Sequence, residues 1–163
     1  MKKLYVIRHG KSDWGNPEVN DFNRPLNHRG LKDAPRMGKY LFNNHDRADI
    51  ILSSPAKRAI STANIISKEI NYSESKIIKN EKIYLASKES LLQIINSIDD
   101  HNNCAYIFGH NPGFSNLASY LTDDWIDMKT CCVAILMSNV DSWGHWSKGI
   151  ANLEKYLSPK NIN

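Results

Sequence analysis

Short, fully apolar runs alternate with longer amphipathic stretches along most of the chain. The runs in KLYVIR (3–8), DIILSS (49–54) and AYIFGH (105–110) are apolar at consecutive positions, which is typical of strands buried on both faces. We expect strands at these three places and near 76–79, and helices at 28–44, 55–70, 88–98 and 113–121. Such alternation predicts an α/β fold with a mostly parallel sheet covered by helices on both faces.

The C-terminal part of the chain has a different pattern. VAILMSN (133–139) has the composition of a strand, turn-forming residues follow at 141–144, and HWSKGI (145–150) is predicted to be a returning strand. This hairpin would add an antiparallel edge to the sheet. A length of 163 residues suits one domain spanning 1–163, without a separate cap domain.

Composition restricts the class of protein. Apolar residues make up 41% of the sequence, as in soluble globular proteins, and no apolar run approaches the roughly 18 residues that a membrane helix needs. The N-terminal apolar stretch is only LYVI before Arg8, without a small-residue cleavage site after it, so we expect a cytoplasmic protein. Cys104, Cys131 and Cys132 contain no C-x-x-C pair, which argues against a disulfide framework or a zinc site and favours buried strand residues.

Positive charge is concentrated in the first third of the chain. All six arginines fall within the first 58 residues, where lysine and arginine outnumber aspartate and glutamate, whereas acidic residues are in slight excess after residue 60. A guanidinium grips phosphate or carboxylate at two points, so this bias favours an anionic ligand. No long basic run or basic helix interleaved with aromatic residues is present, so we expect no nucleic-acid partner.

Three of the predicted strands lead into cationic or imidazole side chains. LYVI ends at Arg8 and His9, DIIL leads through SSP to Arg58, and AYIF leads to His110. Ligands of open parallel sheets bind beyond the carboxyl ends of the strands, so these four side chains should meet at one rim. We expect Ser54 to cap the helix that carries Arg58, whose N-terminus also favours anions.

Two histidines among arginines suit phosphoryl transfer better than metal binding. Arginines would repel a metal ion, whereas they stabilise the oxygens of a phosphoryl group, so we expect no metal and no cofactor. A neutral imidazole can attack phosphorus and form a phosphohistidine that water then hydrolyses. The residue pattern alone leaves open which histidine attacks. We expect the pH dependence to follow these histidines near their ordinary pKa of about 6–7.

At these motifs the chain resembles the histidine phosphatase superfamily, and within it the SixA-like phosphohistidine phosphatases. The resemblance rests on RHGKSDW (8–14), DFNRPLNHRGLKDAPRMGKYL (21–41) with its RPL element, SSPAKRAISTA (53–63) and GHNPG (109–113). It extends from residue 4 to about residue 150. It implies a three-layer α/β sandwich of the phosphoglycerate mutase-like type. It also implies that His9 is the nucleophile and that Arg8, Arg58 and His110 hold the phosphoryl group. Arg24 would add a further phosphate contact, and Ser12 and Asn111 are weaker candidates for the same role.

One feature of many superfamily members is missing from this sequence. They carry a carboxylic acid that protonates an alcohol leaving group, and here only Glu81 and Glu89 are candidates, neither in a convincing context. A bond from phosphorus to imidazole needs less help to break. The short chain also leaves little material for a lid. The resemblance therefore favours a monomer that acts on a phosphohistidine-bearing protein, such as a phosphotransfer domain.

Three other functions remain open from the sequence. The chain could be a small-molecule phosphomonoesterase or mutase of the same superfamily, which a carboxylate at the mouth of the pocket would favour. It could be a phosphate-binding regulatory module, although such a module has no need of a nucleophile. A metal-dependent hydrolase is the remaining alternative, which insensitivity to chelators would exclude.

Overall fold

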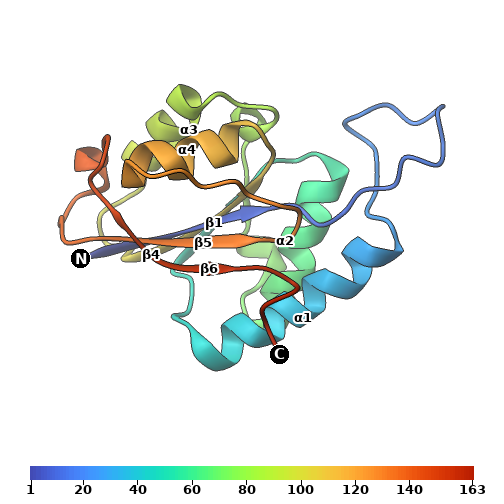
Figure 1. Ribbon diagram of the computed structural model, residues 1–163, viewed down its shortest axis with the longest axis horizontal. Helices are drawn as coiled ribbons and strands as arrows, with labels where there is room; N and C mark the ends of the chain where they lie inside the picture. Colours follow the sequence, from blue (N-terminus) through green and yellow to red (C-terminus); the bar gives the residue numbers. More distant parts are fainter.

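The computed structural model describes residues 1–163 as a six-stranded sheet between two pairs of helices (Figure 1). The strands are β1 (Lys2–Arg8), β2 (Ile50–Ser53), β3 (Ile78–Lys79), β4 (Cys104–Gly109), β5 (Val133–Ser138) and β6 (Asn152–Leu157). The helices are α1 (His28–Asn44), α2 (Lys57–Glu69), α3 (Lys88–Asn96) and α4 (Gly113–Thr122). Short 3₁₀ helices occupy Glu74–Lys76, Glu81–Ile83 and Trp143–His145. No helix combines the length and the hydropathy needed to cross a membrane.

The predicted α/β architecture is confirmed. The strand order is β3-β2-β4-β1-β5-β6, in which the first four strands are parallel and β5 and β6 add an antiparallel edge. Alternate residues of β1 point to opposite faces, so Leu4 and Val6 pack in the core under α3 and α4, whereas Tyr5 and Ile7 pack against α1 and α2. The helices therefore cover both faces of the sheet, as Figure 1 shows.

Strand register brings the two histidine motifs together. Arg8 lies opposite Gly109 in the parallel pair of β1 and β4, so His9 and His110 leave adjacent strands at the same level. The amide of His9 donates to the Gly109 carbonyl at 3.0 Å. On the other side of β4, the amide of Ser54 donates to the Phe108 carbonyl at 3.0 Å. The carboxyl ends of β1, β4 and β2 thus form one rim, as the sequence predicts.

The returning strand of the C-terminal hairpin was predicted in the wrong place. Residues 145–150 do not pair with β5, and β6 begins at Asn152. Trp143 and Trp146 instead stack with their ring centroids 5.1 Å apart and are buried. Asn96 Nδ2 at the end of α3 donates to the carbonyls of both tryptophans, at 2.8 and 3.0 Å. Burial of two large aromatic side chains therefore outweighs strand pairing in this segment.

The start of α2 also differs from the prediction. The helix begins at Lys57 with Ala56 at the N-cap, so Ser54 is not its cap. Ser54 Oγ accepts a hydrogen bond from the Ala56 amide at 3.2 Å and contacts His110 Nε2 at 2.8 Å. The side chain that was expected to cap the N-terminus of α2 is thus part of the histidine cluster.

All three cysteines are free and buried, as predicted, but only Cys104 lies in a strand. Cys104 begins β4, and Cys131 and Cys132 precede β5. They pack in the cores on the two faces of the sheet.

Candidate active site

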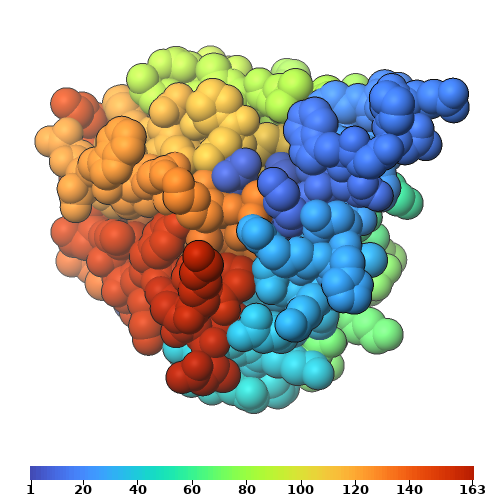
Figure 2. Space-filling view, turned by 45° about the vertical axis from the view of Figure 1, so that its right-hand side comes forward, coloured from blue at the N-terminus to red at the C-terminus, as the bar shows by residue number.

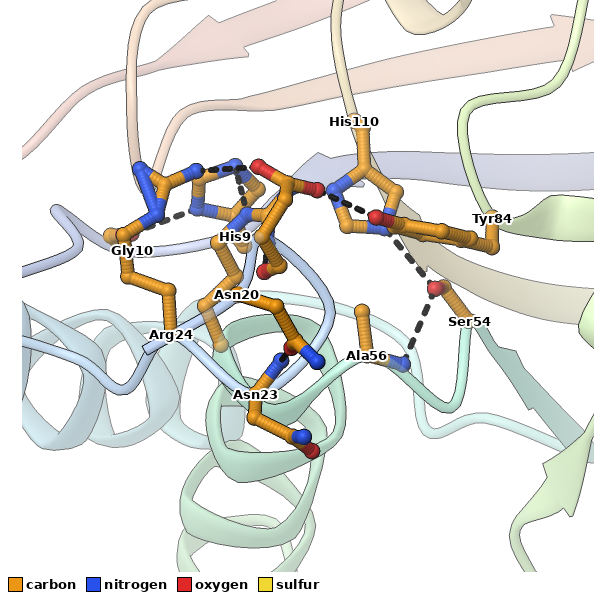
Figure 3. A network of polar contacts seen from close by, with 11 residues as sticks. His9, Gly10, Asn20, Asn23, Arg24, Ser54, Ala56, Tyr84 and His110 are labelled. Carbon is orange, nitrogen blue, oxygen red and sulfur yellow. Dashed lines mark hydrogen bonds and ion pairs between the residues drawn. The ribbon is translucent and has the colours of Figure 1, made fainter. Parts of the chain in front are cut away.

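His9 and His110 face each other at the rim, with ring centroids 5.2 Å apart. Figure 3 shows both rings in one polar network with Arg24, Ser54 and Tyr84. Both histidines are buried, as are Arg24 and Arg58. The structure therefore brings together the histidines and arginines that the sequence singles out, although they come from distant segments of the chain.

The ring of His9 is held in one orientation by its own chain. His9 Nδ1 lies 2.6 Å from the Gly10 carbonyl oxygen, which can only accept, so Nδ1 carries the proton. Arg58 Nε donates to His9 Nε2 at 3.3 Å, which requires a lone pair on Nε2. Burial, followed by the positive charges of Arg58, Arg8 and Arg24, lowers the pKa of His9 to about 3 despite the favourable contact with Gly10. His9 is therefore neutral at neutral pH, with Nε2 unprotonated.

Arg58 and Arg24 converge on Asp21, from the loop between β1 and α1. Arg58 Nη1 donates to the Asp21 carbonyl at 2.6 Å and Nη2 donates to Asp21 Oδ2 at 3.1 Å. Arg24 Nη2 donates to Asp21 Oδ1 at 2.8 Å, and its guanidinium stacks on Trp14 with Cζ 3.6 Å from the ring centroid. Nε and Nη1 of Arg24 are buried without a partner. These arginines are thus fixed in place, with donors left over for an anion.

Arg8 is held by the loop that precedes β5. Its Nη1 donates to the Met128 carbonyl at 2.9 Å, whereas its buried Nε has no partner. The same carbonyl accepts from Asn111 Nδ2 at 2.8 Å, and Asn111 Oδ1 accepts from the amide and hydroxyl of Ser115 on α4. Asn111 therefore anchors the loop that holds Arg8. This contact differs from the direct phosphate contact expected from the sequence.

His110 is the second imidazole of the site and contacts Ser54 and Tyr84. His110 Nε2 lies 2.8 Å from Ser54 Oγ, and its Nδ1 is buried without a partner. The Tyr84 ring packs edge-on against the His110 ring, with the two ring centroids 5.4 Å apart. Burial, followed by the charges of nearby groups, lowers the pKa of His110 to about 3. Both histidines are therefore neutral, and the expectation that they titrate near 6–7 is wrong for the free protein.

Comparison with known proteins agrees with this arrangement of residues. The family model described as the histidine phosphatase superfamily (branch 1) matches residues 4–83. An uncharacterised protein of Mycobacterium tuberculosis is 31% identical over 117 residues, which cover 71% of this chain and 69% of that protein. The chain belongs to the histidine phosphatase superfamily.

Solved structures of SixA proteins have the same fold as this histidine phosphatase family member. A protein named SixA from Agrobacterium tumefaciens superposes with a TM-score of 0.83 at 24% identity, over 97% of this chain and 98% of that one. The protein histidine phosphatase SixA complexed with tungstate superposes with a TM-score of 0.79 at 18% identity, over 98% of both chains. The fold is therefore the phosphoglycerate mutase-like sandwich that the sequence predicts.

Other candidate residues of this family member lie at the margin of the site or outside it. Ser12 is buried, and its backbone forms an isolated bridge with Leu26, but its hydroxyl makes no hydrogen bond. Glu81 and Glu89 are exposed. Glu89 pairs with Lys88, and its pKa is lowered by a backbone hydrogen bond and by Lys88, so it is ionised at neutral pH. Glu81 forms no ion pair with the arginines of the site.

Sequence reasoning missed Asp21 and Tyr84 as parts of the site. The Tyr84 hydroxyl donates to Asp21 Oδ2, and the other carboxylate oxygen of Asp21 accepts from Arg24. Partial burial acts to raise the pKa of Asp21, but the Tyr84 hydrogen bond and the charge of Arg58 outweigh it and keep the pKa low. The spacing DFNR (21–24) was the signal available, because it places a carboxylate one turn before the arginine of RPL.

Proposed function

We propose that the protein is a phosphohistidine phosphatase that removes phosphate from histidine on a partner protein, with His9 as nucleophile. The observation that carries the proposal is the state of His9. Its Nδ1 proton is bound to the Gly10 carbonyl, and its Nε2 lone pair faces Arg58 Nε. The binding of tungstate, a tetrahedral oxyanion like phosphate, by the SixA protein of similar fold gives further support.

The first chemical step transfers the phosphoryl group to His9. The lone pair of Nε2 attacks phosphorus, the bond from phosphorus to the substrate's imidazole nitrogen breaks, and its electron pair leaves with that ring, which takes a proton from solvent. His9 keeps its Nδ1 proton on the Gly10 carbonyl throughout. In the second step, water attacks phosphorus, the electron pair of the P–N bond returns to Nε2, and inorganic phosphate departs.

Four side chains stabilise the charge on the transferring group. The unpaired nitrogens of Arg8 and Arg24 are available to the phosphoryl oxygens, and Arg58 already lies against Nε2. When the Ser54 hydroxyl donates to His110 Nε2, the proton of the neutral His110 ring is on Nδ1, which has no other partner. Nδ1 can then donate this proton in a hydrogen bond to a phosphoryl oxygen. Such preorganised donors in a buried site supply much of the rate enhancement of phosphoryl transfer.

The substrate class follows from the leaving group that the site can accommodate. A general acid must hold its proton at neutral pH, but Asp21 is ionised between Arg58 and Arg24, and no other carboxylate pairs with the arginines of the site. An alkoxide would leave poorly without an acid, whereas imidazole leaves readily. The site therefore suits phosphohistidine better than alkyl phosphates.

The test is turnover of a phosphotransfer domain carrying radiolabelled phosphohistidine, with a panel of aryl and alkyl phosphates measured in parallel. The wild type should release inorganic phosphate from phosphohistidine, hydrolyse aryl phosphates with acidic phenols slowly and leave alkyl phosphates nearly untouched. Acid-labile phosphate should be trapped on His9 and be absent from His9→Ala. His101→Ala is the matched control, because His101 is exposed just before β4, at the opposite end of that strand from the site.

Two further substitutions test the absence of an acid. Glu81→Gln and Glu89→Gln should each stay within a few-fold of the wild-type rate, far from the roughly 10²–10⁴-fold loss of a true general acid. Faster turnover of alkyl monoesters than of phosphohistidine would identify a small-molecule phosphatase instead. Phosphate binding without turnover of any substrate would identify a regulatory module.

A further inference from the structure

A second cavity, of about 720 Å³, opens at the same rim as the histidines but over β1, β5 and β6. Its walls come from the first turns of α1, from the loop before β5 and from the segment that follows β6. Figure 2 shows this side of the molecule, where the light-blue start of α1 lies beside the red C-terminal segment. The volume lies in the range of small-molecule sites, about 300–1,000 Å³.

The charges that line this cavity are very unequal. Seven lining residues are lysine or arginine, whereas Asp33 is the single carboxylate. Asp33 compensates two of the arginines of α1, Arg29 at 3.7 Å and Arg36 at 3.6 Å. Lys11, Lys32 and Lys160 form no ion pair. Like charges this close together repel one another. The positive potential in the cavity also raises the local concentration of anions.

The walls are held together by the arginines themselves. Arg29 Nη2 donates to Thr130 Oγ1 at 3.1 Å, which joins α1 to the loop before β5. Arg36 Nη2 donates to the Pro159 carbonyl at 3.3 Å, which joins α1 to the C-terminal segment. Buried Asp33 lies between these two arginines on the same helix. The cavity is therefore preorganised, which lowers the entropic cost of binding.

This cavity is separate from the phosphoryl site. Arg8 lines it, but His9, Arg24, Arg58 and His110 do not. A single phosphoryl group between the histidines therefore leaves the unpaired lysines of the cavity, Lys11, Lys32 and Lys160, uncompensated. We propose that the cavity is a second anion site, which binds a small ligand carrying two or more linked phosphate groups. Seven of the thirteen lining residues are cationic, so recognition rests on the charged groups of the ligand.

The experiment is calorimetric titration with inorganic tripolyphosphate at about 0.15 M salt, where screening over about 8 Å suppresses long-range attraction. In Lys32→Glu/Lys160→Glu, tripolyphosphate affinity should fall at least about tenfold, while hydrolysis of p-nitrophenyl phosphate stays unchanged. Lys76→Glu/Lys79→Glu changes the net charge equally near β3, at the far edge of the sheet, and should alter the affinity less than about threefold. All four lysines are exposed, so both variants should keep the wild-type Tm.

A third variant, Arg58→Ala, distinguishes binding in the cavity from binding at the phosphoryl site. Arg58→Ala weakens the phosphoryl site but leaves the cavity lining intact, so it should bind tripolyphosphate as the wild type does; Arg58→Gln serves if the alanine variant does not fold. Loss of tripolyphosphate binding in the Arg58 variant, or equal weakening in the β3 control, would overturn the proposal. Equal affinity for hexaglutamate would also overturn it, because the cavity would then receive an acidic polypeptide.

Discussion

Asp21 occupies the place where two arginines of the site converge. Its two carboxylate oxygens accept from Arg24 and Arg58, and its side chain is 43% exposed at the mouth. In the free protein this carboxylate compensates charges that would otherwise repel each other. A phosphoryl group bound by the free donors of Arg24 would compete with Asp21 for the positive charge of both arginines, at some cost in free energy.

Asp21→Asn removes this internal competitor and keeps a side chain of the same shape. We expect inorganic phosphate to bind more tightly, by about three- to tenfold, because the arginines lose a charged partner worth roughly 1 kcal/mol at such an exposed position. Competitive inhibition of p-nitrophenyl phosphate hydrolysis measures the change. Asp46→Asn is the matched control, because Asp46 forms its ion pair with Lys3, at the start of β1. Weaker phosphate binding in Asp21→Asn would instead make Asp21 a residue that orients the arginines.

Site residues that come directly after a strand are easier to predict from the sequence than site residues that lie in loops. His9, Arg58 and His110 could be placed at one rim because each follows a strand of the parallel sheet. Asp21 lies in a polar loop without periodicity, and Tyr84 reaches it from 63 positions away. Asn111 was identified, but its amide is engaged by Met128 and Ser115, a contact that depends on the fold of the loop before β5. Adjacency in sequence does not determine such contacts.

At the scale of elements, the buried strands and the short edge strand β3 were predictable, whereas the C-terminal edge strand β6 was not. The interior strands β1, β2 and β4 are continuous apolar runs, which are recognisable without a structure. The edge strand β6 is NLEKYL, and most of its residues are exposed, so it carries no apolar alternation. The aromatic HWSKGI segment looked more like a strand, but Trp146 is buried against α3 instead. Tertiary packing overrides strand propensity at this point.

Trp146→Ala tests how much that packing contributes to stability. The Trp146 side chain is only 2% exposed and stacks on Trp143, so its loss should lower the free energy of unfolding by about 3–5 kcal/mol. Urea denaturation measures the change. Trp125→Ala is the control, since Trp125 is 85% exposed and its removal should change stability by less than about 0.5 kcal/mol. A similarly small change in Trp146→Ala would mean that packing of this buried side chain does not stabilise the fold.

At the scale of the whole molecule, the parallel strands gather cations at one rim. Arg8, Arg24 and Arg58 surround the histidines, and the second cavity continues the positive surface over β5 and β6. This concentration of charge acts with burial to keep His9 and His110 neutral. The same arrangement that prepares the site for an anion therefore makes protonation of the folded protein unfavourable.

Acid should consequently destabilise the whole fold before its carboxylates titrate. His9 and His110 have pKa values of about 3 in the folded state, against an ordinary value of about 6.5 in the unfolded chain. Between these values the unfolded chain binds more protons, so the free energy of unfolding falls as the pH drops from about 6.5 towards 3. At pH 4.5 the loss of unfolding free energy should be about 2–3 kcal/mol for each histidine, at 1.36 kcal/mol per pH unit.

Urea denaturation of His110→Gln between pH 7 and pH 4.5 should show a smaller loss of unfolding free energy than the wild type, whereas His101→Gln should follow the wild type. Equal losses in all three proteins would show that His110 has the same pKa in the folded and the unfolded state, which would contradict the prediction.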